Sequence, residues 1–186
     1  MERLVVGISG SSGPHYGVAL LRALRELGGI ETHLVVSKGA RMVLASETDL
    51  NAKALSGLAD VVHEPQNLAA SISSGSFRTM GMAIAPCSMK TLAGVALGYA
   101  DNLLTRAAEV TLKERRKLVL VPRETPLSLT HLRNMVTATE AGAVILPPVP
   151  AFYHRPRTID DVIAQTVGKI LDQFGIQHEL FERWGE

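Results

Sequence analysis

The sequence predicts a doubly wound α/β domain, in which helices cover both faces of a parallel sheet. Short β-branched apolar runs alternate with longer segments whose apolar residues recur three and four positions apart, a pattern typical of βαβ units. The chain has 186 residues, of which 46% are hydrophobic and 20% charged, which excludes a disordered or fibrous protein and fits one domain. We therefore expect a single domain over residues 1–186, with a C-terminal tail from about residue 175.

The elements are expected in the following order. The short apolar runs predict strands at residues 3–8, 31–36, 80–85, 117–122 and 143–146. The helical period predicts helices at residues 15–28, 39–48, 90–97, 102–115, 129–140 and 159–174. Residues 51–76 have weak periodicity and receive no assignment. Because ligands bind beyond the carboxyl ends of strands in such sheets, the loops after residues 8, 36, 85, 122 and 146 are the candidate binding loops.

Composition excludes several classes of function. Lys plus Arg number 19 and Asp plus Glu 18, so the chain has no global field for nucleic acid or an anionic membrane. No apolar run approaches the roughly 20 residues of a membrane helix, and the opening MERLVVGISG resembles a first core strand more than a signal peptide. Cys87 is the only cysteine, which excludes an intramolecular disulfide and fits a reducing cytoplasm.

The loop after the first strand, SGSSGPHYG, has the features of an anion site. Gly10 and Gly13 allow the backbone to approach a ligand, and Ser11 and Ser12 offer hydroxyls at a helix N-terminus. Its glycine spacing matches neither GxGxxG nor GxxxxGK[ST], so a mononucleotide phosphate fits better than a dinucleotide or a nucleoside triphosphate. An ordinary tight turn with a serine cap is the alternative.

Two further strand ends carry polar residues. Ser37 follows the second strand, and its position fits either a ligand contact or the N-cap of the next helix. After the third strand, Ser88, Lys90 and Thr91 cluster at a helix start and form a second polar cradle. Cys87 precedes them, but no nearby histidine or basic run argues for a lowered thiol pKa. This favours a buried structural cysteine over a nucleophile.

A helix and the strand after it concentrate positive charge. Arg106 and Lys113 are seven residues apart and therefore share a helix face. Arg123 and Glu124 follow the fourth strand, where the ligand crevice opens. Three cations can thus converge on an anion. We interpret the neighbouring arginines 115–116 as solvated charges that complement the helix C-terminus.

The loop PAFYHRP after the last strand is stiff and partly aromatic. Tyr153 in this loop is a candidate hydrogen-bond donor to phosphate or a packing anchor. The histidines have no HxxxH or HxH spacing, so metal ligation has little support. Asp160 and Asp161 lack the further aspartate of a magnesium-binding prenyl diphosphate motif, and Thr158 with Asp161 predicts a capping box instead.

Taken in order, these strings resemble one known family from residue 4 to the end of the chain. They are GISGSSGPHYG, HLVVSKGAR, ETD, PCSMKT, DNLLTRAAEVTLKERR, LVLVPRETPL, GAVILPPVPAFYHRP and the closing RWGE. The chain resembles the UbiX-type flavin prenyltransferases, including the subgroup paired with reversible aromatic acid decarboxylases. The resemblance implies a flavodoxin-like (Rossmann-like) three-layer fold and a homododecamer.

The resemblance also implies an activity. The family joins a dimethylallyl group from dimethylallyl phosphate to reduced FMN without a metal. The product, prenylated FMN, serves a UbiD-type decarboxylase in ubiquinone biosynthesis or in aromatic acid breakdown. We therefore expect a cytoplasmic enzyme with no nucleic-acid partner and no integral membrane segment.

Residue roles are implied where the family's motifs match. The implied FMN contacts are Gly10, Ser11, Ser12, Ser37, Ser88, Met89, Lys90, Thr91 and Arg123. The implied dimethylallyl phosphate contacts are Tyr153, Lys169, Arg106, Lys113 and Arg123, some of them from a neighbouring subunit. This chain has lysine at position 169, where the family often has arginine, which keeps the charge and loses bidentate geometry.

The implied reaction gives these charges a physical purpose. Breaking the carbon–oxygen bond of an allylic phosphate releases an anion, so donors aimed at the phosphate stabilise its departure. The face of Trp184 suits the developing allylic cation. The candidate catalytic residues are Ser12, Glu47, Lys113, Glu124 and Trp184. Of these, Glu47, Glu124 and Ser12 are candidates for moving the flavin proton, in an order that the sequence leaves open.

Two alternatives accompany this prediction. FMN-dependent cysteine-type decarboxylases share the fold, but they carry a PxMN string where this chain has PCSMKT and a histidine where residues 37–41 have none. A non-catalytic FMN carrier or assembly subunit of a decarboxylase is the second alternative. The presence of Tyr153, Lys169, Arg106 and Lys113 indicates a second phosphate site. A carrier would have no use for such a site.

Overall fold

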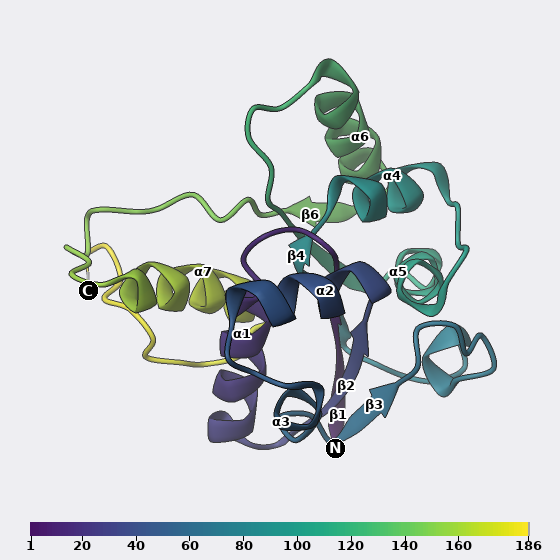
Figure 1. Cartoon of the computed structure of the whole chain (residues 1–186), viewed down its shortest axis with the longest axis horizontal. Coiled ribbons are helices and arrows are strands. Elements are labelled where there is room, and N and C mark those ends of the chain that lie inside the picture. Colours follow the sequence, from purple (N-terminus) through teal and green to yellow (C-terminus); the bar gives the residue numbers. More distant parts are fainter. Residues whose placement is uncertain (186) are drawn as a thin grey trace.

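The protein forms a six-stranded, wholly parallel sheet with helices on both faces (Figure 1). The structure, a computed structural model, describes residues 1–185 apart from the side chain of Ala52, so Glu186 of the RWGE string lies outside the described residues. The strands are β1 (Glu2–Ile8), β2 (Ile30–Val36), β3 (Val61–His63), β4 (Gly81–Cys87), β5 (Lys117–Pro122) and β6 (Ala143–Ile145). Their order, β3-β2-β1-β4-β5-β6, confirms the predicted doubly wound, three-layer fold.

Within residues 1–185, six of the seven helices begin and end within two residues of the predicted positions, and one lies in the unassigned segment. They are α1 (His15–Leu27), α2 (Lys38–Glu47), α3 (Ala52–Ser56), α4 (Met89–Leu97), α5 (Leu103–Lys113), α6 (Leu129–Glu140) and α7 (Ile159–Gln173), with a 3-10 turn η1 (Ser71–Ser73). Side-chain caps explain several starts: Thr158 and Asp161 form the predicted capping box of α7.

Alternation along the strands divides the apolar core into two layers. In β1, Leu4 and Val6 face one layer, which contains α1, α2 and α7. Val5 faces the other layer, with α4, α5 and α6. The buried β-branched and leucine residues on both strand faces explain why the strands read as continuous apolar runs.

The unassigned segment contains three short elements. Within residues 51–76 lie α3, the edge strand β3 and η1. Strand β3 has three residues and α3 has five, which is too short for either periodicity to be recognised. The third predicted strand is also longer than expected, because Pro86 and Cys87 remain within β4.

One glycine brings helix α1 close to the sheet. A Cβ atom at Gly17 would lie 2.8 Å from Ile8 Cδ1 and would collide with the Ala85 carbonyl oxygen. Only glycine therefore allows α1 to lie this close to the ends of β1 and β4. The N-terminus of α1 is thereby held beside the carboxyl ends of the central strands.

Candidate functional site

A cavity of about 850 Å³ opens at the carboxyl ends of β1, β2, β4 and β5. This volume is within the usual range for small-molecule sites. Its lining includes all the predicted FMN contacts, Gly10, Ser11, Ser12, Ser37, Ser88, Met89, Lys90, Thr91 and Arg123, together with Glu124. The structure therefore brings together residues from four loops, at the point where strand order reverses between β1 and β4.

Two helix N-termini open into this cavity. Ser37 caps α2 by accepting a hydrogen bond from the Ala40 amide at 3.1 Å, and it also lines the cavity. Ser88 caps α4, accepts from the Thr91 amide at 3.3 Å and donates to Thr91 Oγ1 at 3.1 Å. Ser37 is thus both an N-cap and a cavity residue, and the two helix dipoles favour an anion between them.

The first loop contributes an unsatisfied hydroxyl. The Oγ atom of Ser11 is buried and has no hydrogen-bond partner among the described residues. A buried polar group of this kind costs free energy unless a ligand satisfies it. Gly10 also allows a close approach of two loops, because a Cβ atom there would lie 3.0 Å from the Gly39 carbonyl carbon.

Glu47 lies beside the same loop. Its carboxylate accepts a 2.8 Å hydrogen bond from the Gly13 amide, and this bond lowers the pKa of Glu47. A hydrogen bond with Ser12 and the charge of Arg123 act in the same direction. Glu47 is therefore an ionised group next to Ser12, just outside the cavity lining.

Cys87 is fully buried at the end of β4, and burial raises the pKa of its thiol. A thiol held in this form is a poor nucleophile, which agrees with the structural interpretation.

A second group of predicted residues lies around the C-terminal tail. The rings of Tyr153 and Trp184 meet edge to face, with centroids 5.7 Å apart. Lys169 on α7 pairs with Asp172, its Nζ atom 3.6 Å from Oδ2. Over residues 1–185, the lining of the large cavity does not include Tyr153, Lys169 or Trp184.

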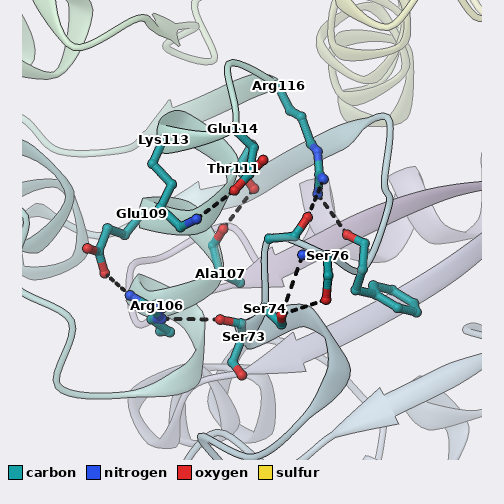
Figure 2. Close-up of polar contacts among 12 residues, drawn as sticks. Ser73, Ser74, Ser76, Arg106, Ala107, Glu109, Thr111, Lys113, Glu114 and Arg116 are labelled. Atoms are coloured by element: carbon teal, nitrogen blue, oxygen red, sulfur yellow. Dashed lines mark hydrogen bonds and ion pairs between the residues drawn. The ribbon is translucent and has the colours of Figure 1, made fainter.

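A third group lies between α5 and the segment 73–77 (Figure 2). Arg106 Nε donates to the Ser73 carbonyl oxygen at 3.2 Å and Nη1 to Glu109 at 2.8 Å. Lys113 Nζ donates to Glu114 at 2.6 Å, which lowers the pKa of Glu114. The predicted convergence of Arg106 and Lys113 with Arg123 is therefore not found within one chain, because Arg123 lines the cavity and the other two face segment 73–77.

Sequence reasoning missed the clearest contact of this third group. Arg116 donates to the carbonyl oxygens of Gly75 at 2.6 Å and Phe77 at 2.7 Å, so the interpretation of this residue as a solvated helix-end charge was wrong. A Cβ atom at Gly75 would collide with the paired Lys113 and Glu114 side chains. No signal in the sequence distinguishes Arg116 from its exposed neighbour Arg115.

The described chain offers no sign of a metal centre or of a membrane span. Within residues 1–185, no group of three or more His, Cys, Asp or Glu side chains is arranged to hold a metal ion. In the same range, none of the helices combines the length and the apolar character needed to cross a bilayer.

Comparison with known proteins agrees with this geometry. A family model described as Flavoprotein matches residues 1–172. The flavin prenyltransferase UbiX of Escherichia coli K12 is 61% identical over 186 residues, which cover 99% of this chain and 98% of that protein.

Two crystal structures match nearly the whole chain. The dodecameric FMN-dependent UbiX-like decarboxylase of Escherichia coli O157:H7 is 54% identical with a TM-score of 0.96, over 99% of this chain and 100% of that one. AnUbiX (PadA1) in complex with FMN and dimethylallyl pyrophosphate is 52% identical with a TM-score of 0.97, over 100% of this chain and 98% of that one.

Proposed function

Because this chain belongs to the Flavoprotein family, among its UbiX flavin prenyltransferases, we propose that it joins a dimethylallyl group from dimethylallyl phosphate to reduced FMN. The observation that carries the proposal is the cavity at the strand ends, which is lined by two capped helix N-termini and by Ser11, whose buried hydroxyl has no partner among residues 1–185.

The cavity residues fit FMN. Ser11, Ser37 and Ser88 offer hydroxyls beside helix N-termini, which suits a phosphate monoester. Met89 and Ala93 add apolar surface for a flat ring system, and Arg123 adds a cation at the rim. FMN supplies the nucleophilic ring to which the prenyl group is attached, and AnUbiX has been crystallised with FMN.

The chain's cations act on the leaving group. In the proposed transfer the carbon–oxygen bond of the allylic phosphate breaks, the phosphate leaves with the electron pair, and the prenyl carbon bonds to the flavin. Arg123, Lys113 and Lys169 stabilise the departing phosphate, and the Tyr153 hydroxyl donates to it. Trp184 lies against Tyr153, where its π face stabilises positive charge on the prenyl fragment and excludes water.

Completing the new ring requires loss of a flavin proton. Glu124 lines the cavity and supplies a carboxylate that accepts a proton there. Ser12 also lines the cavity, and the ionised Glu47 lies behind it. This arrangement suits a relay from the cavity through the Ser12 hydroxyl to Glu47.

The complete site requires more than one copy of the chain. Arg106, Lys113, Tyr153 and Lys169 lie outside the cavity lining of their own chain, whereas Arg123 lines it. We therefore propose that neighbouring subunits supply further phosphate-binding side chains. A homododecamer, as in the UbiX-like decarboxylase of Escherichia coli O157:H7, is the assembly we propose. We further propose a cytoplasmic location and delivery of prenylated FMN to a UbiD-type decarboxylase.

A direct test combines the purified protein with anaerobically reduced FMN and dimethylallyl phosphate and weighs the released flavin by mass spectrometry. A flavin heavier by one five-carbon unit is expected. Its absence, with FMN bound, would favour the carrier alternative. Retention of full activity in both Lys113→Ala and Glu124→Gln would contradict the roles assigned to these two residues.

A further inference from the structure

We propose that Asp172 is a positioning residue that fastens the C-terminal tail, residues 175–185, to α7 and orients the Lys169 ammonium group. The proposal rests on the proposed function for its effect on substrate. The attachment of the tail itself is independent of any reaction.

Asp172 is the centre of a cluster of cations. Arg183 in the tail donates to both of its carboxylate oxygens, at 2.7 Å to Oδ1 and 3.2 Å to Oδ2. Lys169, one turn earlier on α7, lies 3.6 Å from Oδ2. The Asp172 side chain is only 20% exposed, so these pairs are better shielded from water than ordinary surface pairs. A two-pronged arginine pair of this kind fixes geometry as well as charge.

His178 attaches the tail at a second point. Its Nε2 atom lies 2.9 Å from the Gly168 carbonyl oxygen and 3.2 Å from Asp172 Oδ1. The Leu180 amide donates to Nδ1 at 3.2 Å. Both ring nitrogens of His178 therefore take part in the attachment, Nε2 to α7 and Nδ1 within the tail. Asp172 therefore receives hydrogen bonds from two tail residues, His178 and Arg183. Arg183 directly precedes Trp184 in the sequence.

Packing continues the attachment beside these polar contacts. A Cβ atom at Gly168 would collide with the Phe181 ring, so the glycine admits Phe181 against α7. The Phe181 ring also lies 5.4 Å from the Arg183 guanidinium carbon. The tail is thus held by a mixed polar and aromatic contact centred on one turn of α7.

The attached tail brings Trp184 to Tyr153. Trp184 directly follows Arg183, the residue that pairs with Asp172, and its ring meets that of Tyr153 at 85°. One carboxylate therefore influences Lys169 on its own helix and Trp184 on the tail. Removing its charge weakens the two-pronged contact to Arg183 and the ion pair to Lys169 at the same time, which loosens the attachment of the tail to α7.

The test uses the full-length protein and the variant Asp172→Asn. Trp184 is the only tryptophan, so its time-resolved fluorescence anisotropy reports how firmly the tail is held. We expect Asp172→Asn to add a fast depolarising motion that is absent from the wild type. We also expect KM for dimethylallyl phosphate to rise by about tenfold, equivalent to about 1.4 kcal/mol, with FMN affinity unchanged because the tail is outside the FMN cavity.

Two further variants complete the design. Asp160→Asn removes a carboxylate from the other end of α7 and should match the wild type in both measurements. Arg183→Gln removes the same contact from the side of the tail and should reproduce the fast motion of Trp184. If Asp172→Asn fails to fold, this variant tests the attachment of the tail in its place.

The outcomes separate this inference from the proposed function. Wild-type anisotropy in Asp172→Asn, or in Arg183→Gln where the first variant does not fold, overturns the inference. An unchanged KM in a variant with a released tail overturns the effect on substrate. If the wild type transfers no prenyl group, the proposed function fails, whereas the anisotropy comparison still decides whether Asp172 holds the tail.

Discussion

The hydroxyl of Ser11 is buried beside the first strand end and has no partner among residues 1–185. Ser11→Ala should weaken FMN binding by about 10- to 100-fold, because a hydrogen bond to a charged phosphate contributes about 1.5–3 kcal/mol. The same substitution should leave the stability of the FMN-free protein unchanged or raised, since it removes an unsatisfied polar group. Fluorescence titration with FMN and thermal unfolding measure the two effects.

Ser46→Ala is a matched control for this prediction. The Ser46 hydroxyl donates to the Val43 carbonyl oxygen on the exposed side of α2, away from the cavity lining. FMN affinity should be unaffected. Equal affinity for FMN in wild type and Ser11→Ala would show that the phosphate lies elsewhere.

Single residues also show how far the sequence predicts the candidate site. Ser11, Ser37 and Ser88 were predictable because each follows a strand end, where the fold class already locates ligands. Arg116 and Asp172 were not, because their partners are 39 to 41 residues away in one case and in the C-terminal tail in the other. Surface-type residues acquire such roles only through tertiary contacts that carry no local pattern.

At the scale of elements, burial decides what could be predicted. Strands β1, β2 and β5 are within one residue of the predicted bounds, because both of their faces are buried and their apolar runs are continuous. Edge strand β3 contains only Val61–His63, and none of its residues is fully buried. A strand with little apolar burial lacks the signal on which sequence prediction depends.

The close approach of α1 to the sheet makes Gly17 sensitive to substitution. Gly17→Ala should lower the free energy of unfolding by about 1–3 kcal/mol, the usual cost of overpacking, because the new methyl group would meet Ile8 and the Ala85 carbonyl oxygen. Urea unfolding measures this change. FMN binding should weaken as well, since any shift of α1 moves the loop that carries Ser11 and Ser12.

Gly57→Ala, at the C-cap of α3, is the control for adding a methyl group at a glycine. A Cβ atom at Gly57 would lie 3.5 Å from the Ala54 and Lys53 carbonyl oxygens, which is ordinary contact, so stability should be nearly unchanged. If both glycine variants were equally stable, the packing of α1 against β4 would be looser than the structure indicates.

Arg116 holds segment 73–77 beside the C-terminal end of α5, where Lys113 lies (Figure 2). Arg116→Gln removes the charged fork that holds the Gly75 and Phe77 carbonyl oxygens. Hydrogen exchange of the amides in segment 73–77 should accelerate. Because Gly75 lies against Lys113, kcat/KM for dimethylallyl phosphate should fall about tenfold, equivalent to about 1.4 kcal/mol, with FMN affinity retained.

The neighbouring arginine offers a control with the same change in charge. Arg115 is exposed, and Arg115→Gln should leave hydrogen exchange and kinetics at wild-type values. Identical behaviour of the two glutamine variants would mean that net charge near Lys113, and not the attachment of segment 73–77, sets the affinity for the allylic phosphate.

At the scale of the whole molecule, helix α6 presents an apolar stripe to solvent. Leu129, Leu132 and Val136 recur at helical spacing and are 61%, 46% and 57% exposed. Three large apolar side chains aligned on one helix face indicate a surface that another chain covers. The same conclusion follows from the site, because Lys113 and Lys169, two of the cations proposed to bind the allylic phosphate, lie outside the cavity lining of their own chain.

These two observations predict that activity depends on assembly. Leu132→Glu should reduce the molecular mass measured by native mass spectrometry, since a buried unpaired carboxylate at an interface disfavours association by several kcal/mol. Prenyl transfer should fall with the mass, whereas Leu27→Glu, on an equally exposed leucine at the C-terminal end of α1, should change neither. A Leu132→Glu protein that is monomeric and fully active would require each chain to move Lys113 or Lys169 into its own cavity, which contradicts the attachment of Lys113 beside Gly75 and of Lys169 beside Asp172.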